Sequence, residues 1–251
     1  MKKLEKPSLS TQEISAAYDL LFETRGALRD SDIFYRWVLN QLAPRPGQHL
    51  LDVACGEGIL LKFARAYGLH PIGIDLAPKG AQLAQAFVGE KIITIANGEA
   101  LPFADGSFDL VTNLGSLEHF LHPLNGVKEI CRVMNPGGLA AVFLPNSYYL
   151  VDIIWHVLRT GYSVSHRQPL ENFATSREWW DFLESGGLQV IKTYKYNYIF
   201  PRSTSDWQWF RQHPRKLLNL LAAPFIPFNL SNHFLYICRR EPSAAGNKNS
   251  V

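Results

Sequence analysis

Two acidic residues and a pair of glycines mark the stretch of this sequence that is best suited to chemistry. Asp52 lies in the apolar run 50–53, and Glu57 lies between Gly56 and Gly58. Glycines let the backbone turn sharply and leave no side chain between the backbone and a ligand. Apolar residues then resume with helical spacing, so the segment predicts a buried strand, a tight turn and a helix whose N-terminus faces the ligand.

The same stretch distinguishes between two kinds of nucleotide ligand. Dinucleotide folds use G-x-G-x-x-G, but Leu61 stands where the third glycine is required. The carboxylates of Asp52 and Glu57 would repel a pyrophosphate and favour a ligand with a cationic end. Asp75 lies near the end of a second apolar segment, 71–76, at the place where an acidic residue binds ribose hydroxyls in doubly wound folds. We therefore expect a ligand whose ribose has both hydroxyls free.

Three ordered motifs resemble the class I S-adenosylmethionine-dependent methyltransferases. They read D-V-A-C-G-E-G from Asp52, G-I-D-L-A from Gly73, and N-G-E-A-L-P-F-A-D-G-S-F-D-L-V-T-N-L-G-S-L-E-H-F from Asn97. The L-P-F, S-F-D and L-E-H-F groups are typical of the branch that methylates small molecules, quinones and lipids, with a type 11-like methyltransferase domain. The resemblance covers about residues 48–146.

The resemblance implies a single domain over residues 1–251. Its fold would be α/β, a Rossmann-like doubly wound sheet of seven strands whose last strand is antiparallel and near the sheet's edge. Residues 1–46 would form helices that cover the cofactor as a lid, and 47–146 would form the cofactor-binding core. Residues 147–240 would hold acceptor-side insertions and the last two strands, with a disordered tail over 241–251. The implied reaction moves a methyl group from S-adenosylmethionine to an oxygen of a small or lipid-like acceptor, with nitrogen or carbon as alternatives.

The resemblance also implies which residues bind the cofactor. Tyr18 would reach the methionine end from the lid, although packing on its own helix face is a competing interpretation. Asn97 stands where the family commonly has aspartate, and its amide oxygen can still accept from the adenine amine; Asn97 and Gly98 could instead be turn residues only. The expected cofactor residues are Tyr18, Asp52, Ala54, Gly56, Glu57, Gly58, Asp75, Leu76, Asn97, Gly98, Glu99, Asn113, Leu114 and Gly115.

His119 follows the fourth predicted strand, close to where cofactor and acceptor should meet. Its near-neutral unperturbed pKa suits a general base that takes the acceptor's proton, but the ring could also hold the loop through a backbone carbonyl. With Glu118 and His122 it forms an incomplete set of metal ligands. Pro123 breaks the helix that would align them, so we expect no metal.

Two aromatic insertions are expected to choose the acceptor. We predict that residues 148–173 and 201–228 form one continuous wall, because both follow strands whose carboxyl ends face the cofactor. The second insertion is also basic, so a cap that touches a membrane surface is one interpretation. Burial in a helical layer or a dimer contact is the commoner fate of such aromatics. The expected acceptor residues are Tyr148, Tyr149, Trp155, His156, Trp207, Trp209 and Phe210.

Composition narrows the remaining choices. The 251 residues carry a net charge of only +3, which gives no reason to expect nucleic-acid binding. Three cysteines without C-x-x-C spacing favour a reducing cytoplasm over a disulfide framework. The sequence begins without the apolar run of a signal peptide and has no membrane-spanning stretch, so we expect a soluble protein. A non-catalytic S-adenosylmethionine-binding protein and a nucleotide-dependent oxidoreductase remain as other functions.

Overall fold

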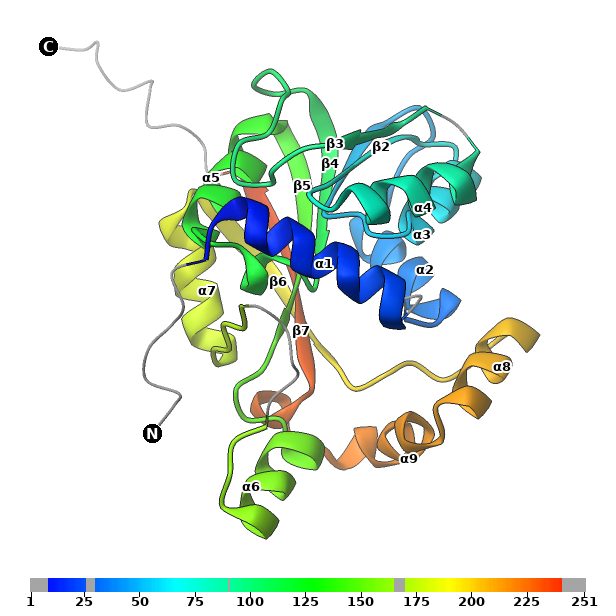
Figure 1. The fold of residues 1–251 in the computed structure, drawn as a ribbon, viewed down its shortest axis with the longest axis vertical. Coiled ribbons are helices and arrows are strands. Elements are labelled where there is room, and N and C mark those ends of the chain that lie inside the picture. The colour runs from blue at the N-terminus through cyan, green and yellow to red at the C-terminus, as the bar shows by residue number, and fades with distance from the viewer. Residues whose placement is uncertain (1–8, 26–29, 90, 165–169, 241–251) are drawn as a thin grey trace, which may run out of the picture.

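The computed structural model describes residues 9–25, 30–89, 91–164 and 170–240 (Figure 1). Seven strands form one sheet in the order β3-β2-β1-β4-β5-β7-β6. All neighbouring strands are parallel except β7, which is antiparallel to β5 and β6, so the predicted fold class is confirmed. β7 lies one strand in from the edge, which is β6. The strands are β1 (His49–Val53), β2 (His70–Asp75), β3 (Ile93–Ile95), β4 (Phe108–Leu114), β5 (Met134–Pro145), β6 (Leu188–Tyr196) and β7 (His233–Arg240).

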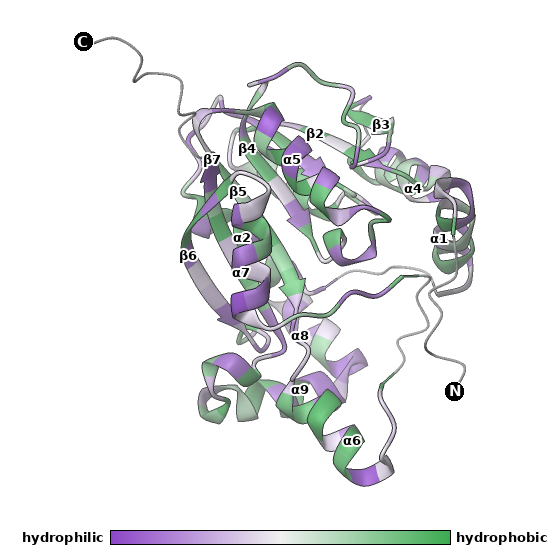
Figure 2. Ribbon diagram, turned by 90° about the vertical axis from the view of Figure 1, so that its left-hand side faces the viewer, coloured by the Kyte–Doolittle hydropathy of each residue, from purple (hydrophilic) through white to green (hydrophobic). Residues whose placement is uncertain are grey.

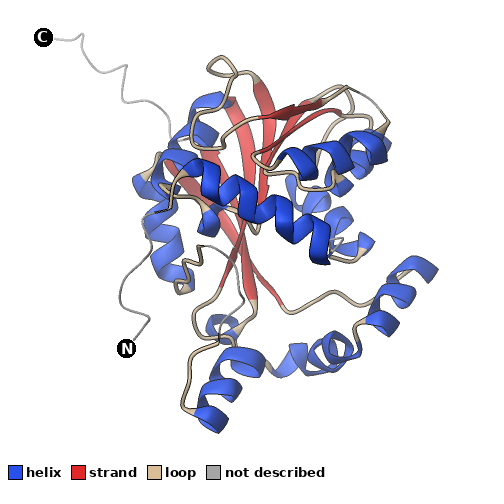
Figure 3. Cartoon of the chain, viewed as in Figure 1, coloured by secondary structure: helices blue, strands red, loops and turns tan. Residues whose placement is uncertain are grey.

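Helices cover both faces of the sheet and form two apolar cores (Figure 3). One core joins the sheet to α2 (Asp32–Leu42) and α3 (Ile59–Ala66), and α4 (Pro78–Val88) packs against α3. The other core joins it to α5 (Pro123–Val133) and α7 (Ser176–Ser185). Apolar side chains project from both faces of the sheet and pack against these helices. The central strands are therefore buried almost throughout, as is usual for parallel strands.

Helix α1 (Thr11–Arg25) covers the cofactor side of the core. It begins at a capping box in which Ser10 N donates to Glu13 Oε2 at 2.8 Å and Glu13 N donates to Ser10 Oγ at 3.3 Å. Two contacts fix it on the core: Ser15 Oγ donates to the Leu76 carbonyl at 3.0 Å, and Asp19 accepts the Lys79 N–H at 2.7 Å. The expected lid helix is therefore docked at the end of β2 and the start of α4.

Several boundaries differ from those expected from the sequence. The sequence predicts a strand over residues 91–96 and a helix from residue 127, whereas β3 covers Ile93–Ile95 and α5 begins at Pro123. The Asn-Pro-Gly-Gly run over 135–138 predicts a turn, but β5 already begins at Met134. The reason is tertiary, because Met134 pairs with Phe108 of β4 before a register shift. The expected tail over 241–251 lies outside the described residues.

Both insertions begin at the same end of the sheet, where the carboxyl ends of β5 and β6 lie. β5 and β6 each pair antiparallel with β7 and so run in the same direction, which places their carboxyl ends together. The first insertion contains a π-helical turn, Leu150–Ile154, and α6 (Trp155–Thr160); the second contains α8 (Thr204–Gln212) and α9 (Pro214–Ala222). α6 and α9 lie side by side in Figures 1 and 2. Asn146 ties the start of the first insertion to the chain that follows the second, since its Nδ2 donates to the carbonyls of Asn229 and Ser231, both at 2.8 Å.

Candidate active site

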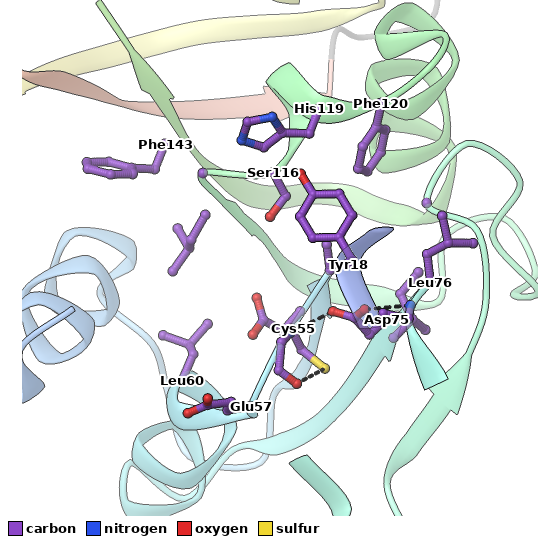
Figure 4. A pocket seen from close by; sticks show the side chains of 18 of the residues that line it. Tyr18, Cys55, Glu57, Leu60, Asp75, Leu76, Ser116, His119, Phe120 and Phe143 are labelled. Atoms are coloured by element: carbon purple, nitrogen blue, oxygen red, sulfur yellow. Dashed lines mark hydrogen bonds between the residues drawn. The ribbon is translucent and has the colours of Figure 1, made fainter. Parts of the chain in front are cut away.

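A cavity of about 540 Å³ opens at the carboxyl ends of β1, β2 and β4, beneath α1 (Figure 4). This is the crossover of the sheet, where open α/β folds bind their ligands. Of the expected cofactor and catalytic residues, the following line the cavity: Tyr18, Asp52, Ala54, Gly56, Glu57, Asp75, Leu76, Asn97, Gly98, Glu99, Leu114, Gly115 and His119. Three separate motifs and the lid helix thus meet in one place.

Asp75 connects the end of β2 to the glycine turn. Its Oδ2 accepts the Gly56 N–H and its Oδ1 accepts the Ala77 N–H, both at 2.8 Å. Burial raises the pKa of this carboxyl, while the two backbone donors oppose the rise. Each oxygen keeps a further lone pair, so Asp75 can hold the turn and also accept from ribose hydroxyls.

Asp52 provides a second buried carboxyl beside the turn. Thr112 Oγ1 donates to its Oδ1 at 2.6 Å. Burial raises the pKa of Asp52 to about 7, although the Thr112 bond lowers it. Two poorly solvated carboxyls in one cavity are compatible with a cationic ligand, which would stabilise their charged forms, and unfavourable for a pyrophosphate.

Asn97 serves the turn after β3 and also lines the cavity. Its Oδ1 accepts the Glu99 N–H at 2.9 Å, which is the turn role considered from the sequence. Gly98 lies against Phe120, whose Cζ would be 2.5 Å from an added Cβ. Any side chain at residue 98 would therefore push Phe120 out of the cavity wall.

Tyr18 and His119 meet across the cavity, with ring centroids 6.1 Å apart in an edge-to-face arrangement. Burial raises the pKa of the Tyr18 hydroxyl, and the charges of Glu118 and Asp75 raise it further. Tyr18 is therefore a neutral cavity-wall residue brought in by α1. Its position agrees with the lid interpretation.

His119 makes the loop contact that was one of the two interpretations from the sequence. Nδ1 contacts the carbonyl oxygen of Leu170, which can only accept, so Nδ1 carries the proton of the neutral ring. Nε2 is then the basic nitrogen, and it lies 3.6 Å from Glu118 Oε1. Burial raises the pKa of Glu118 to about 8, and within the described part of the chain its Oε2 has no hydrogen-bond partner. The loop contact thus selects the tautomer that a general base needs.

Two expected cofactor residues do not line the cavity, and both have structural contacts. Asn113 Nδ2 donates to the Val53 carbonyl at 3.2 Å, and its Oδ1 accepts the Leu117 N–H at 2.9 Å. Gly58 has φ +74° at the N-cap of α3, and an added Cβ would lie 3.1 Å from the side chains of Ala84 and Val88. Gly58 therefore lets α3 approach α4.

None of the seven expected acceptor residues is among the residues that line the cavity. Tyr149, Trp209 and Phe210 are buried in the insertions, whereas Tyr148, Trp155, His156 and Trp207 are exposed. Among the lining residues that were not expected from the sequence are Asp30, Phe34, Tyr35, Phe143, His213 and Lys216. The i, i+3 spacing of His213 and Lys216 on a basic segment was the only sequence signal for that pair.

Within residues 9–25, 30–89, 91–164 and 170–240, no group of three or more His, Cys, Asp or Glu side chains is arranged to hold a metal ion. The backbone N–H of His122 donates to Glu99 Oε1 at 3.0 Å, and His122 is not among the residues that line the cavity.

Comparison with known proteins supports the methyltransferase function that is expected from the sequence motifs. Residues 51–142 match a family described as a methyltransferase domain. The ubiquinone biosynthesis O-methyltransferase of Cereibacter sphaeroides is 28% identical over 209 residues, which are 79% of this chain and 75% of that protein.

Two solved structures share the fold. The 4+2 cyclase SpnF has a TM-score of 0.68 at 18% identity and covers 94% of this chain and 98% of its own. A phosphoethanolamine N-methyltransferase of Haemonchus contortus, in complex with S-adenosylhomocysteine, has a TM-score of 0.61 at 17% identity, over 95% of this chain and 59% of its own. The two structures show the shared fold. The methyltransferase domain matched over residues 51–142 and the O-methyltransferase relatives support a class I S-adenosylmethionine-dependent methyltransferase.

Proposed function

We propose that this enzyme methylates a hydroxyl oxygen of a small aromatic or lipid-like acceptor. The observation that carries the proposal is the position of His119, which lines the same cavity as the cofactor motifs and has its basic nitrogen selected by the Leu170 contact. Relatives named ubiquinone biosynthesis O-methyltransferases support oxygen as the methylated atom.

The cavity residues fit S-adenosylmethionine, which supplies an activated methyl group when bound. Asp75 would accept from the ribose hydroxyls, Asn97 and Gly98 would contact the adenine, and Asp52 and Glu57 would favour the cationic end. In the proposed reaction the acceptor oxygen would take the methyl group, with the new carbon–oxygen bond replacing the sulfur–methyl bond and S-adenosylhomocysteine as the second product. His119 Nε2 would accept the hydroxyl proton. Most of the catalysis then comes from positioning, for which intramolecular reactions suggest up to about 7–11 kcal/mol.

The competing functions make different products. Mass spectrometry of cell extract incubated with the protein and methyl-labelled cofactor would identify the methylated atom directly. An O-methyl product supports the proposal, whereas an N- or C-methyl product overturns the choice of oxygen. The 4+2 cyclase shows that this fold also occurs in a protein with another described activity. Absence of label transfer across a broad acceptor panel would favour a binding protein, and binding of a nicotinamide cofactor would favour an oxidoreductase.

The outer surface of the two insertions supports a second part of the proposal, contact with a lipid surface. Trp155, Leu158 and Tyr162 on α6 and the residues after it have helical i, i+3, i+7 spacing, and all are exposed, Leu158 by 74%. Leu218, Leu221 and Phe225 repeat this spacing on and after α9, and Phe225 is 86% exposed. Figure 2 shows the apolar colouring of α6 and α9 on neighbouring helices.

Charge favours an anionic lipid surface as the occupant of this face. Arg159, Arg211 and Arg215 are exposed around the apolar residues. The only acid in residues 197–240 is Asp206, which is buried and accepts the Ile33 N–H at 3.0 Å. Amphipathic helices with this combination lie in the interface of anionic membranes. In the part of the chain that the structure describes, no helix is long and apolar enough to cross a bilayer.

A further inference from the structure

The cavity has a second end, which the cofactor motifs do not occupy. Figure 4 places Phe143 on the opposite side of the view from Asp75 and Leu76. Phe34 lies against Phe143 with ring centroids 4.9 Å apart, and against Tyr35 at 5.1 Å. Lys216 and His213 reach the cavity from α9 and its N-cap. This second end is therefore walled by aromatic rings and carries a lysine.

Lys216 is held in place by ring faces. Its Nζ lies 4.5 Å from the ring centroid of Trp209 and 5.5 Å from that of Tyr198. Burial lowers the pKa of this ammonium, while the charges of Asp30 and Asp152 raise it. Within the described part of the chain, no carboxylate oxygen lies within 4.0 Å of Nζ. The rings fix the position of the charge, and they leave its hydrogen-bond donors available to a ligand.

Asp30, one of the two acids whose charges raise the pKa of this lysine, has its own hydrogen-bond partners. Asp30 Oδ2 accepts from the Tyr196 hydroxyl at 2.9 Å, and Oδ1 accepts from the Ser31 N–H at 2.6 Å. Burial raises the pKa of Asp30, so its charged form is disfavoured. Asp152, the other acid whose charge raises the pKa of Lys216, is exposed to solvent, and the cavity acids Asp52 and Asp75 lie at the carboxyl ends of β1 and β2. An anionic group at the second end would therefore meet Lys216 with little competition.

His213 shapes the same wall. Its Nδ1 donates to the Trp209 carbonyl at 2.8 Å, and its ring stacks on Trp209 with centroids 4.4 Å apart. Nε2 is then the nitrogen that a ligand hydroxyl could approach. The ring orientation is set by α8, so this part of the wall is formed before a ligand binds.

We propose that the second end is a subsite for a carboxylate carried by an aromatic acceptor, with Lys216 as its ligand and the rings of Phe34, Tyr35 and Phe143 around the acceptor ring. The proposal rests on the proposed O-methylation and names the class of substrate for it: an aromatic hydroxy acid. An ammonium that binds a carboxylate at a partly desolvated site discriminates against a neutral analogue. Lys216 would then determine specificity without taking part in the methyl transfer.

The test compares two probes that differ only in charge, 3,4-dihydroxybenzoate and 3,4-dihydroxybenzamide. Their affinities for protein saturated with S-adenosylhomocysteine are measured by calorimetry. The wild type should bind the carboxylate about ten- to a hundredfold more tightly than the amide. Lys216→Met should reduce this preference to about onefold and leave the amide and S-adenosylhomocysteine affinities unchanged. Lys216→Arg should keep most of the preference, and Arg215→Met should keep all of it, because Arg215 is exposed and does not line the cavity.

The outcomes separate this inference from the proposed function. An equal preference in wild type and Lys216→Met, a wild type that binds the amide as tightly as the carboxylate, or a carboxylate that does not bind would each overturn the subsite. A Lys216-dependent preference without methyl transfer to any hydroxyl would retain the subsite and overturn O-methylation. Methyl transfer to neutral phenols, without any preference for the carboxylate over the amide, would retain O-methylation and overturn the subsite.

Discussion

Asp75 accepts the backbone N–H of Gly56 at 2.8 Å, so a side chain at the end of one strand holds the glycine turn that follows another. The ribose-binding carboxylate expected from the sequence is thus also a structural residue. This double role means that a substitution at Asp75 changes two measurable quantities, the cofactor affinity and the free energy of unfolding.

Asp75→Ala should reduce affinity for S-adenosylhomocysteine about ten- to a hundredfold, because a charge-assisted bond contributes about 1.5–3 kcal/mol. It should also lower the free energy of unfolding by about 1–3 kcal/mol through the unpaired N–H groups of Gly56 and Ala77. Calorimetry and urea unfolding measure the two effects. Asp109→Ala is the matched control, because Asp109 accepts the His49 N–H at 2.9 Å but does not line the cavity. Unchanged cofactor affinity in Asp75→Ala would sink the ribose assignment.

His119→Ala should lower the methyl-transfer rate about 10²- to 10⁴-fold, since it removes the base that takes the acceptor's proton. Cofactor affinity should stay nearly constant. Single-turnover transfer of a labelled methyl group, with cofactor calorimetry, separates these quantities. Ser116→Ala, at a neighbouring cavity position, is the control and should retain most of the rate. An equal loss of cofactor binding or of folding would assign His119 to structure alone.

Glu118→Gln should make stability less dependent on pH. The folded-state pKa of Glu118 is raised to about 8 by burial, so the folded protein binds a proton that the unfolded chain has lost. Wild-type stability should therefore fall as pH rises from about 4.5 and level off above about 8. The amide has no proton to lose, and Glu118→Gln should be more stable than wild type by an order of 1–3 kcal/mol at alkaline pH. The difference should vanish toward pH 5.

Thermal unfolding across this pH range measures the effect, and Glu129→Gln is a control of opposite sign. The Arg132 bond lowers the pKa of Glu129, so its carboxylate contributes stability that is lost on acidification. Glu129→Gln should be less stable than wild type near neutral pH and approach it in acid. A Glu118→Gln curve parallel to wild type would show that Glu118 is ionised throughout.

Removing exposed apolar side chains from α9 and the turn after it should weaken vesicle binding. The double variant Leu221→Ser, Phe225→Ser should bind phosphatidylcholine vesicles that contain phosphatidylglycerol about tenfold more weakly or worse. Full insertion of each apolar side chain into the lipid contributes roughly 1.5–3 kcal/mol to the binding free energy. Vesicle sedimentation measures this. Ile95→Ser is the matched control, since Ile95 is similarly exposed on β3. If the wild type does not bind vesicles but forms a dimer, and these substitutions abolish the dimer, the apolar face is a contact between two copies of the chain and not a lipid-binding surface.

The sequence by itself determined the cofactor half of the site. The order of motifs around Asp52, Asp75 and Asn97 specifies which strand ends carry polar residues, and parallel strands bring those ends to one edge whatever the details of packing. Local chemistry also determined the starts of several elements. The Ser10 capping box depends on residues three positions apart, and Pro78 at the first turn of α4 fixes its own backbone angle.

Only the tertiary structure decided the acceptor half. The aromatic residues Trp209 and Phe210 were expected to contact the acceptor, but both are buried beside Tyr198. Lys216, whose Nζ lies against the rings of Trp209 and Tyr198, lines the cavity in their place. Phe143 and Asp30 enter the site through packing of α2 against β5 and β6, which joins residues more than a hundred positions apart. Hydrophobic periodicity predicts which residues of an element are buried. It does not predict which neighbouring element covers them, because that depends on long-range contacts, and these contacts decide which side chains remain free to contact a ligand.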